Sequence, residues 1–193
     1  MALSTGSKKI KTAVFISGTG SNLQSLIRFS KLKKSPISIK MIVSNNLKSK
    51  GLAFGKIYKI RKNIFNFKKQ AIAEKEILLK LKKNKISLIC LAGFMKILSK
   101  NFILRFKGQI LNIHPSLLPK YKGLNTHEKA IKNRDKFSGC TVHFVTSKLD
   151  SGKIIIQKEV RIKKNDTPKS LAKRILSQEH KLYPKAILKI SNL

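Results

Sequence analysis

Apolar, strand-like segments alternate with helical segments along most of this chain, and that alternation limits the fold more than any other feature of the sequence. Strands are predicted over 12–17, 39–44, 88–92, 109–113, 141–146 and 153–162. Helices are predicted over 22–32, 67–83, 100–106, 126–133 and 167–181. Because strands that alternate with helices favour parallel pairing, we expect an α/β fold: a mostly parallel sheet with helices on both faces.

No internal repeat or low-complexity linker divides the chain, so residues 1–193 are expected to form a single domain, with 1–11 as a loose leader. Residues 48–66 fit neither the strand nor the helix pattern. The helix over 67–83 is amphipathic. Its buried face is expected to carry Phe67, Ala71, Leu78 and Leu81.

The C-terminal part of the sequence carries clear local signals. The turn Asp150–Gly152 joins the last two strands, which we therefore expect to form an antiparallel pair. Thr167 and Pro168 are typical of a helix start, as N-cap and first helical residue. Pro184 is expected to interrupt this closing helix, because proline lacks the N–H that a helix interior needs.

Basic residues far outnumber acidic ones: the chain holds 43 Lys and Arg against 8 Asp and Glu, a formal net charge of +35. Such an excess is typical of proteins that bind nucleic acid or membrane surfaces. The lysines are spread through nearly every segment, however, and no aromatic residues are interleaved with them as a base-stacking platform requires. We therefore attribute the charge to compositional drift toward Lys, Ile and Asn, and expect no specific nucleic-acid partner.

The number of cysteines and the length of the apolar runs indicate where in the cell the protein is located. Cys90 and Cys140 are too few for a disulfide framework, which fits a reducing environment. The longest apolar run, Ile86–Met95, is about half of what a bilayer demands, and Met1–Lys11 is too polar for a cleavable signal. We expect a cytoplasmic protein without a membrane partner, either a monomer or a weak homodimer.

Ligands bind open parallel sheets beyond the carboxyl ends of the strands, and a glycine-containing loop, Ser17–Asn22, follows the first predicted strand. Backbone N–H groups at a helix start bind anions, and glycine allows a close approach. The loop lacks the Gly-Lys-Ser/Thr of a Walker motif, and Leu23 stands at the third glycine position of the dinucleotide fingerprint. Two interpretations stay open: a monophosphate site, or a tight turn in which Ser21 caps the helix.

Asn112 and His114 project from the same face of a predicted strand, at its carboxyl end. This carboxamide and imidazole could donate hydrogen bonds to an oxyanion, and the imidazole could also transfer a proton. A satisfied polar pair at a strand end is the alternative interpretation. Pro115 and Pro119 stiffen the segment that would hold the pair, and Leu118–Pro119 is a candidate cis peptide.

Asp150 is one of only three aspartates, with Asp135 and Asp166. In a chain that has drifted toward lysine, a retained carboxylate favours a function beyond the ordinary turn role of Asp. Metal ligation is not expected, because the histidines show no ligand-like spacing with one another or with cysteine. The histidines are His114, His127, His143 and His180.

Five motifs follow one another along the chain. They are Ile16–Asn22, Leu91–Leu98, Leu111–Tyr121, Thr141–Val145 with Leu149–Gly152, and Gln178–His180. In this order they resemble the glycinamide ribonucleotide formyltransferase family, and the resemblance runs from Thr12 to about Leu188. It implies a Rossmann-like formyltransferase fold and a folate-dependent enzyme of purine synthesis.

The implied reaction moves a formyl group from 10-formyltetrahydrofolate, the co-substrate, to the amine of N1-(5-phospho-D-ribosyl)glycinamide. The products are formylglycinamide ribonucleotide and tetrahydrofolate. The partners are therefore small molecules, and the mechanism needs no metal. Methionyl-tRNA formyltransferase and formyltetrahydrofolate deformylase share the catalytic domain and stay open as alternatives, although each normally carries a further domain that we do not expect in this chain.

The resemblance also assigns residues, motif by motif. The implied catalytic trio is Asn112, His114 and Asp150. The implied ribonucleotide contacts are Gly20, Ser21 and Asn22 for the phosphate and Glu179 for the ribose or glycinamide end. The implied folate contacts are Gln70, Met95, Lys96, Ile97, Leu98 and Asn112. The positions that depart from the usual family pattern are Gln70, where many relatives carry Arg near the folate glutamate tail, Lys96, Asn125 and Leu176.

In the implied mechanism, Asn112 and a protonated His114 stabilise the oxyanion that forms when the amine attacks the formyl carbon. Each such donor is worth about 10²–10³ in rate. Asp150 favours the imidazolium and helps to pass the amine proton to the folate nitrogen through an ordered water.

Overall fold

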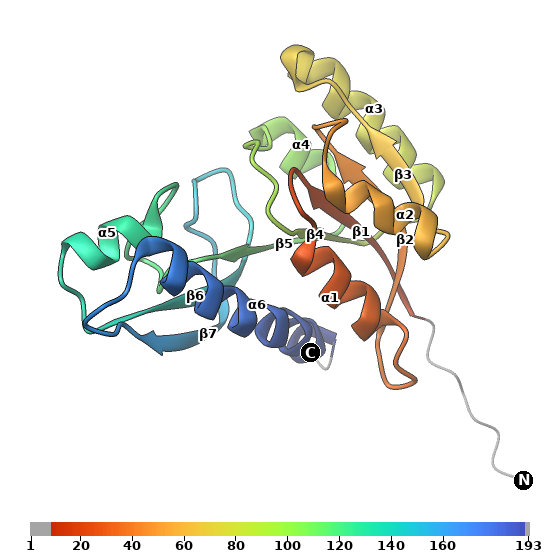
Figure 1. Ribbon diagram of the computed structural model, residues 1–193. Coiled ribbons are helices and arrows are strands. Elements are labelled where there is room, and N and C mark those ends of the chain that lie inside the picture. Colours follow the sequence, from red (N-terminus) through yellow and green to blue (C-terminus); the bar gives the residue numbers. More distant parts are fainter. Residues whose placement is uncertain (1–8, 192–193) are drawn as a thin grey trace, which may run out of the picture.

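The computed structural model describes residues 9–191 and arranges its strands in one sheet of seven (Figure 1). The strands are β1 (Ile10–Ile16), β2 (Ile37–Ser44), β3 (Arg61–Ile64), β4 (Leu88–Leu91), β5 (Gln109–His114), β6 (Phe137–Phe144) and β7 (Ile154–Arg161). Their order across the sheet is β3-β2-β1-β4-β5-β6-β7. All neighbouring strands among β3, β2, β1, β4 and β5 pair in parallel, whereas β6 runs antiparallel to both β5 and β7. The predicted α/β class, with an antiparallel C-terminal strand pair, is confirmed.

Helices cover both faces of this sheet. They are α1 (Ser21–Ser30), α2 (Ala53–Ile57), α3 (Gln70–Lys83), α4 (Lys100–Arg105), α5 (Thr126–Lys132) and α6 (Pro168–Ser191). Two short 3₁₀ turns, η1 (Lys50–Leu52) and η2 (Phe67–Lys69), precede α2 and α3. Every predicted helix is confirmed within a few residues at its start, and within 9–191 no helix combines the length and apolarity that a bilayer crossing needs.

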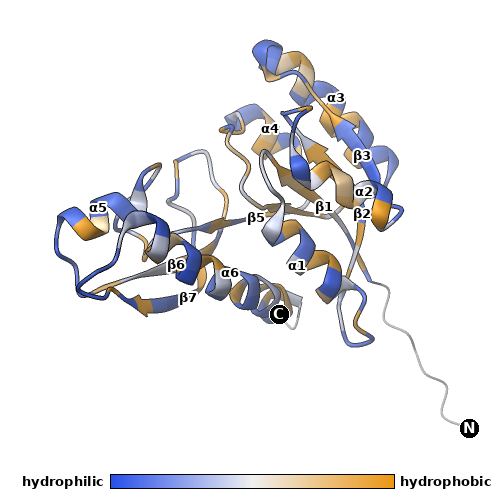
Figure 2. Ribbon diagram, viewed as in Figure 1, coloured by the Kyte–Doolittle hydropathy of each residue, from blue (hydrophilic) through white to orange (hydrophobic). Residues whose placement is uncertain are grey.

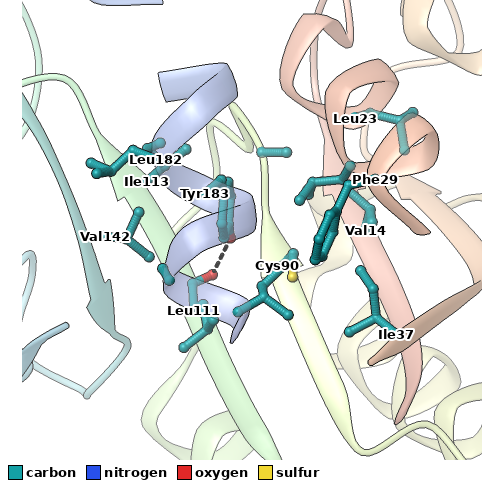
Figure 3. Close-up of a cluster of buried hydrophobic side chains, with 14 of the residues drawn as sticks. Val14, Leu23, Phe29, Ile37, Cys90, Leu111, Ile113, Val142, Leu182 and Tyr183 are labelled. Carbon is teal, nitrogen blue, oxygen red and sulfur yellow. Dashed lines mark hydrogen bonds between the residues drawn. The ribbon is translucent and has the colours of Figure 1, made fainter. Parts of the chain in front are cut away.

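Two hydrophobic cores hold the helices to the sheet. The first packs α1 and α6 on one face, and the second packs α3 and α4 on the other. Tyr183 of α6 is fully buried in the first core, where its hydroxyl donates to the carbonyls of Leu91 (3.1 Å) and Leu111 (3.0 Å); Figure 3 draws the bond to Leu111. These bonds fix α6 to β4 and β5. Cys90 lies beside Tyr183 in the same core, and burial raises the pKa of its thiol to about 12.

Several strand boundaries differ from the prediction. β1 begins at Ile10 and so includes two residues assigned to the leader; the rest of that leader, up to residue 8, lies outside the described residues. β6 begins at Phe137, four residues before its predicted start at 141. β3 lies within the unassigned stretch 48–66, and Figure 2 shows why: this edge strand is mostly blue, because it carries little apolar surface.

The buried face of α3 also differs. Phe67 and Leu81 are buried as predicted, but Ala71 is exposed and Leu78 is only half-buried. The structure instead buries Ala73, Glu74, Ile77 and Leu81. The prediction was wrong at Ala71 because the true face contains a glutamate, which an apolar pattern excludes.

Pro184 does not interrupt the last helix, contrary to the prediction, and α6 continues to Ser191. The helix survives because the carbonyl of His180, which a residue other than proline at 184 would pair, accepts a hydrogen bond from the Ser25 hydroxyl at 2.8 Å. Ala186, Ile187 and Ile190, which follow the proline, are buried in the first core. The N-terminal signals are confirmed: Thr167 accepts from the Ser170 N–H at 3.1 Å, and Pro168 is the first helical residue.

Candidate active site

The strand order reverses direction between β1 and β4, and the loops that follow these two strands meet there. Ser17–Gly20 follows β1, and Ala92–Ser99 follows β4. Parallel α/β sheets bind ligands at such a switch point. The carboxyl end of β5 is only two strand spacings from β1, about 10 Å, so a ligand in the first loop lies close to residues at the end of β5.

The glycine loop is shaped for a close approach of two backbones. Gly20 has φ +77°, and a Cβ there would lie 2.6 Å from the Cα of Gly51. A Cβ on Gly51 would in turn lie 2.9 Å from the Cα of Gly20. Both positions therefore require glycine, and the start of α1 rests directly on the backbone of η1.

Gly20 is the N-cap residue of α1, and Ser21 makes no capping hydrogen bond. The interpretation of Ser21 as a helix cap is therefore wrong. The first amide groups of a helix have no acceptor within it. Because no side chain of residues 9–191 caps them, these amides and the positive end of the helix dipole can bind an anion, which favours the phosphate interpretation.

The Asn22 side chain turns away from the loop and toward α6. Its Nδ2 donates to the Oε2 atom of Glu179 at 2.6 Å, and both side chains are buried. Its Oδ1 finds no hydrogen-bond partner among the residues that the structure describes. Burial raises the pKa of the Glu179 carboxyl, and the bond from Asn22 opposes that rise. The structure thus joins two predicted ribonucleotide contacts that are 157 positions apart in sequence.

A cavity of about 530 Å³ opens at the carboxyl ends of β4 and β5, and its size is typical of a small-molecule site. The predicted catalytic trio lines it, from β5 and from the turn between β6 and β7. Met95, Lys96, Ile97 and Leu98 line it as well. Gln70 lies outside this lining, and its amide instead donates to Glu74 and to the Ile97 carbonyl, at 2.8 Å each.

His114 is held by its backbone surroundings in one orientation. Its Nε2 lies 2.8 Å from the carbonyl oxygen of Tyr121, so Nε2 carries a proton and donates it. The other ring nitrogen, Nδ1, lies 3.4 Å from Oδ2 of Asp150. A proton on Nδ1 would therefore face a carboxylate, which is the arrangement that stabilises an imidazolium. The segment between His114 and Tyr121 contains the cis peptide Leu118–Pro119, as anticipated.

Asp150 is fixed in the turn between β6 and β7. It has φ +45°, and its Oδ2 accepts a hydrogen bond from the backbone N–H of Gly123 at 2.9 Å. Its side chain is 8% exposed. Because backbone geometry and an N–H donor both orient it, the carboxylate is presented to His114 in a defined position.

One further member of this cluster, a histidine, was not predicted from the sequence. His143 of β6 lies opposite Asn112 in the antiparallel register, and its Nε2 is 3.3 Å from Nδ2 of Asn112 and 3.7 Å from Oδ1 of Asp150. Its Nδ1 donates to the Phe144 carbonyl at 2.8 Å, so Nε2 is free to accept from Asn112. Burial lowers the pKa of His143, against the opposing effects of the Phe144 carbonyl and Asp150, and His114 lowers it further. The only signal in the sequence was its place in the motif Thr141–Val145.

His127 also lines the cavity and was not predicted. Burial lowers its pKa, and the nearby His114 adds to that shift. Within residues 9–191, no three His, Cys, Asp or Glu side chains are grouped as metal ligands would be. A carboxamide, an imidazole and a carboxylate together can donate hydrogen bonds and transfer a proton.

Comparison with known proteins gives a consistent result. The formyl transferase family profile matches residues 10–187. Phosphoribosylglycinamide formyltransferase of Haemophilus influenzae is 42% identical over 180 residues, which cover 92% of this chain and 85% of that protein. The human trifunctional purine biosynthetic protein adenosine-3 is 42% identical over 183 residues, 93% of this chain, but the chain spans only 18% of its length.

A solved structure agrees with the sequence comparisons. The crystal structure of phosphoribosylglycinamide formyltransferase from Brucella melitensis superimposes with a TM-score of 0.90 at 41% identity, and the match covers 95% of this chain and 96% of that one. The sheet order, the loop at the switch point and the cluster around His114 are thus found in a chain that, from Ile10 to Ile187, belongs to the formyl transferase family.

Proposed function

We propose that the chain is a phosphoribosylglycinamide formyltransferase, which transfers a formyl group from 10-formyltetrahydrofolate to the amine of N1-(5-phospho-D-ribosyl)glycinamide in purine synthesis. The observation that carries the proposal is the convergence of Asn112, His114 and Asp150 on one wall of the 530 Å³ cavity. The relatives and the solved structure bearing that name support it.

His114 and Asp150 act together in the proposed mechanism. Nε2 of His114 is occupied by the Tyr121 carbonyl, so Nδ1 is the nitrogen that gains and loses a proton. Asp150 stabilises the doubly protonated ring from 3.4 Å. The imidazolium then donates through Nδ1 to the oxygen on which negative charge develops. Asp150 helps to pass the proton that the amine releases to the folate nitrogen, which leaves as the C–N bond to the formyl group breaks.

Asn112 supplies the second donor. His143 accepts one hydrogen of its amide group, which leaves the other hydrogen for the developing oxyanion. The amides at the start of α1 hold the phosphate, and Glu179 contacts the ribose or glycinamide end of the ribonucleotide. Met95, Lys96, Ile97 and Leu98 contact the folate.

We place the reaction in the cytoplasm and propose a monomer or weak homodimer without a specific nucleic-acid partner. The deciding experiment supplies 10-formyltetrahydrofolate with one of three acceptors: the ribonucleotide, formyl-acceptor tRNA, or none. Tetrahydrofolate should form only with the ribonucleotide. Turnover with tRNA would instead identify a tRNA formyltransferase, and turnover without an acceptor would identify a deformylase.

Substitution of the trio tests the residue roles. Asp150→Asn and His114→Ala are each expected to lower kcat by about 10²–10³ or more, because each removes a charge or donor on which the transition state depends. The control is Asp166→Asn, since Asp166 pairs with Arg174 at the start of α6 and does not line the cavity. Near-normal turnover in Asp150→Asn or His114→Ala, with an unchanged circular dichroism spectrum, would refute the assigned roles.

A further inference from the structure

The cavity wall that follows β4 has no regular secondary structure. Residues 92–99 form neither helix nor strand, and Met95, Lys96 and Ile97 in its middle are exposed. Such a segment gains no support from a ladder of backbone bonds, so its shape depends on the contacts at its two ends.

Ser17 holds the first end. Its backbone N–H donates to the Gly93 carbonyl at 3.1 Å, and its hydroxyl accepts from the Met95 N–H at 2.8 Å. The same hydroxyl donates to Oδ1 of Asn45 at 2.5 Å. The start of the segment is therefore tied to the end of β1.

Two side chains of α3 hold the second end. Glu74 is only 4% exposed, and its carboxylate accepts from the Ser99 N–H at 2.8 Å and also from the Ser99 hydroxyl. Gln70, one turn earlier, donates to Glu74 and to the Ile97 carbonyl. The amide of Gln70 thus bridges the helix and the backbone of the cavity wall.

A buried carboxylate is retained only where enough donors surround it. Here an amide, a backbone N–H and a hydroxyl supply them. Ser99 is at the same time the N-cap of α4, where its hydroxyl accepts from the Phe102 N–H at 3.0 Å. Because the Ser99 hydroxyl donates its hydrogen bond to Glu74, an oxygen lone pair of Ser99 points toward the Phe102 N–H. Glu74 therefore fixes the end of the segment and the start of α4 together.

We propose that Glu74 and Gln70 are positioning residues for folate binding, which act by setting the conformation of residues 95–99 rather than by touching the ligand. The proposal rests on the proposed function, because it takes the occupant of this cavity to be the folate. It assigns Gln70 a role different from a direct folate contact: its donors are engaged by Glu74 and Ile97 inside the protein.

The test measures folate binding separately from turnover. Glu74→Gln removes the charge that holds the Ser99 bonds, and Gln70→Met removes both donors of the bridge while keeping a side chain of similar length. Each is expected to weaken tetrahydrofolate binding about tenfold by calorimetry under reducing conditions, the size of effect expected for a lost charge-assisted hydrogen bond. The KM for the ribonucleotide and kcat at saturating folate should stay within about twofold of the unsubstituted enzyme.

The matched control is Glu76→Gln, the same substitution on the exposed face of the same helix. It should leave tetrahydrofolate affinity unchanged. The double variant Glu74→Gln with Gln70→Met should lose much less than the product of the two single effects, because both side chains act through one segment.

Each other outcome is informative. If both single variants bind tetrahydrofolate within twofold of the unsubstituted protein, the proposal is overturned. It is overturned equally if ribonucleotide affinity and kcat fall in proportion with folate affinity, since that pattern indicates a general loss of structure. If the unsubstituted protein itself does not bind tetrahydrofolate, the proposed function fails, and this result is distinct from the other two.

Discussion

Asn112 is oriented by a histidine on the neighbouring strand. The Nδ1 proton of His143 is committed to the Phe144 carbonyl, so its Nε2 can only accept while the ring is neutral. The lowered pKa of His143 preserves that neutral state at physiological pH. The orientation of the Asn112 amide therefore depends on the protonation state of a group that does not itself need to touch a substrate.

Glu179, the proposed contact for the ribose or glycinamide end, lowers the stability of the fold. Its pKa is raised by burial, so its protonated form fits the folded state better than its ionised form. The stability that this group contributes is fully present below its unfolded pKa of about 4.5 and is lost as pH rises through the higher folded value. Burial of this carboxyl group therefore makes the folded protein less stable as pH rises above that window.

Glu179→Gln should accordingly raise the melting temperature at pH 7 by a few degrees, because glutamine imitates the protonated form and can still accept from Asn22. The same change should raise the KM for the ribonucleotide about tenfold or more, since the charged acceptor is lost. Thermal unfolding between pH 4 and pH 8 checks the first part, and steady-state kinetics check the second. A melting temperature below that of the unsubstituted protein at pH 7 would show that the ionised form is not the costly one.

The sequence allowed part of this cluster to be predicted. Asn112 and His114 share a face because side chains alternate along a strand, and both line the cavity. His143 could not be predicted in the same way. Its position opposite Asn112 depends on the antiparallel register of β5 and β6, which is set by strand pairing between segments 31 positions apart.

At the scale of elements, α6 is the clearest case in which tertiary contacts override a local signal. A proline in a helix interior leaves a carbonyl four residues earlier without its donor. Ser25 of α1 supplies that donor to His180, and the residues beyond the proline are buried against the sheet. The helix therefore continues because a second helix compensates for the defect.

A double-mutant cycle can test whether Ser25 replaces the helix hydrogen bond that Pro184 cannot make. Ser25→Ala is expected to lower the free energy of unfolding by about 1 kcal/mol, because it leaves the His180 carbonyl unpaired. In a Pro184→Ala background the same change should cost much less, since the new backbone N–H can bond to His180. Urea denaturation of the four proteins gives the coupling energy, and additive effects would mean that Ser25 does not replace the missing helix bond.

Local pattern located the long elements but not every short one. β3 carries Arg61, Lys62 and Asn63, and it is held at the sheet edge by its pairing with β2 rather than by apolar side chains. On α3, the buried Glu74 breaks the apolar pattern, and two of its hydrogen-bond donors, the N–H and hydroxyl of Ser99, lie 25 positions away. Both features depend on hydrogen bonds between segments that are far apart in the sequence, and local sequence patterns do not predict such bonds.

At the scale of the whole molecule, the net charge of +35 is a standing source of repulsion within the folded state. Salt screens such repulsion, since the Debye length falls from about 30 Å at 0.01 M to about 10 Å at 0.1 M. The few acidic residues are largely engaged at specific contacts, as Asp166 is with Arg174 and Asp150 is with His114.

We therefore expect the melting temperature to rise by several degrees as sodium chloride is increased from about 0.02 M to 0.2 M. A fold stabilised by surface ion pairs would show the opposite effect, a melting temperature that falls with added salt. The comparison protein is the double variant Lys33→Glu and Lys34→Glu, which alters two exposed lysines in the turn after α1. It should melt higher at low salt and respond less to added salt. A melting temperature that falls with salt in the unsubstituted protein would contradict the role of repulsion.

The contact between Gly20 and Gly51 has a consequence for how the gene can change. A single methyl group on either residue would overlap the main chain of the other segment. A larger residue at one position therefore cannot be compensated by a smaller residue at the other, because glycine already has no side chain. Random libraries of this chain, selected for folded protein, should thus return glycine at both positions, even where the neighbouring residues vary.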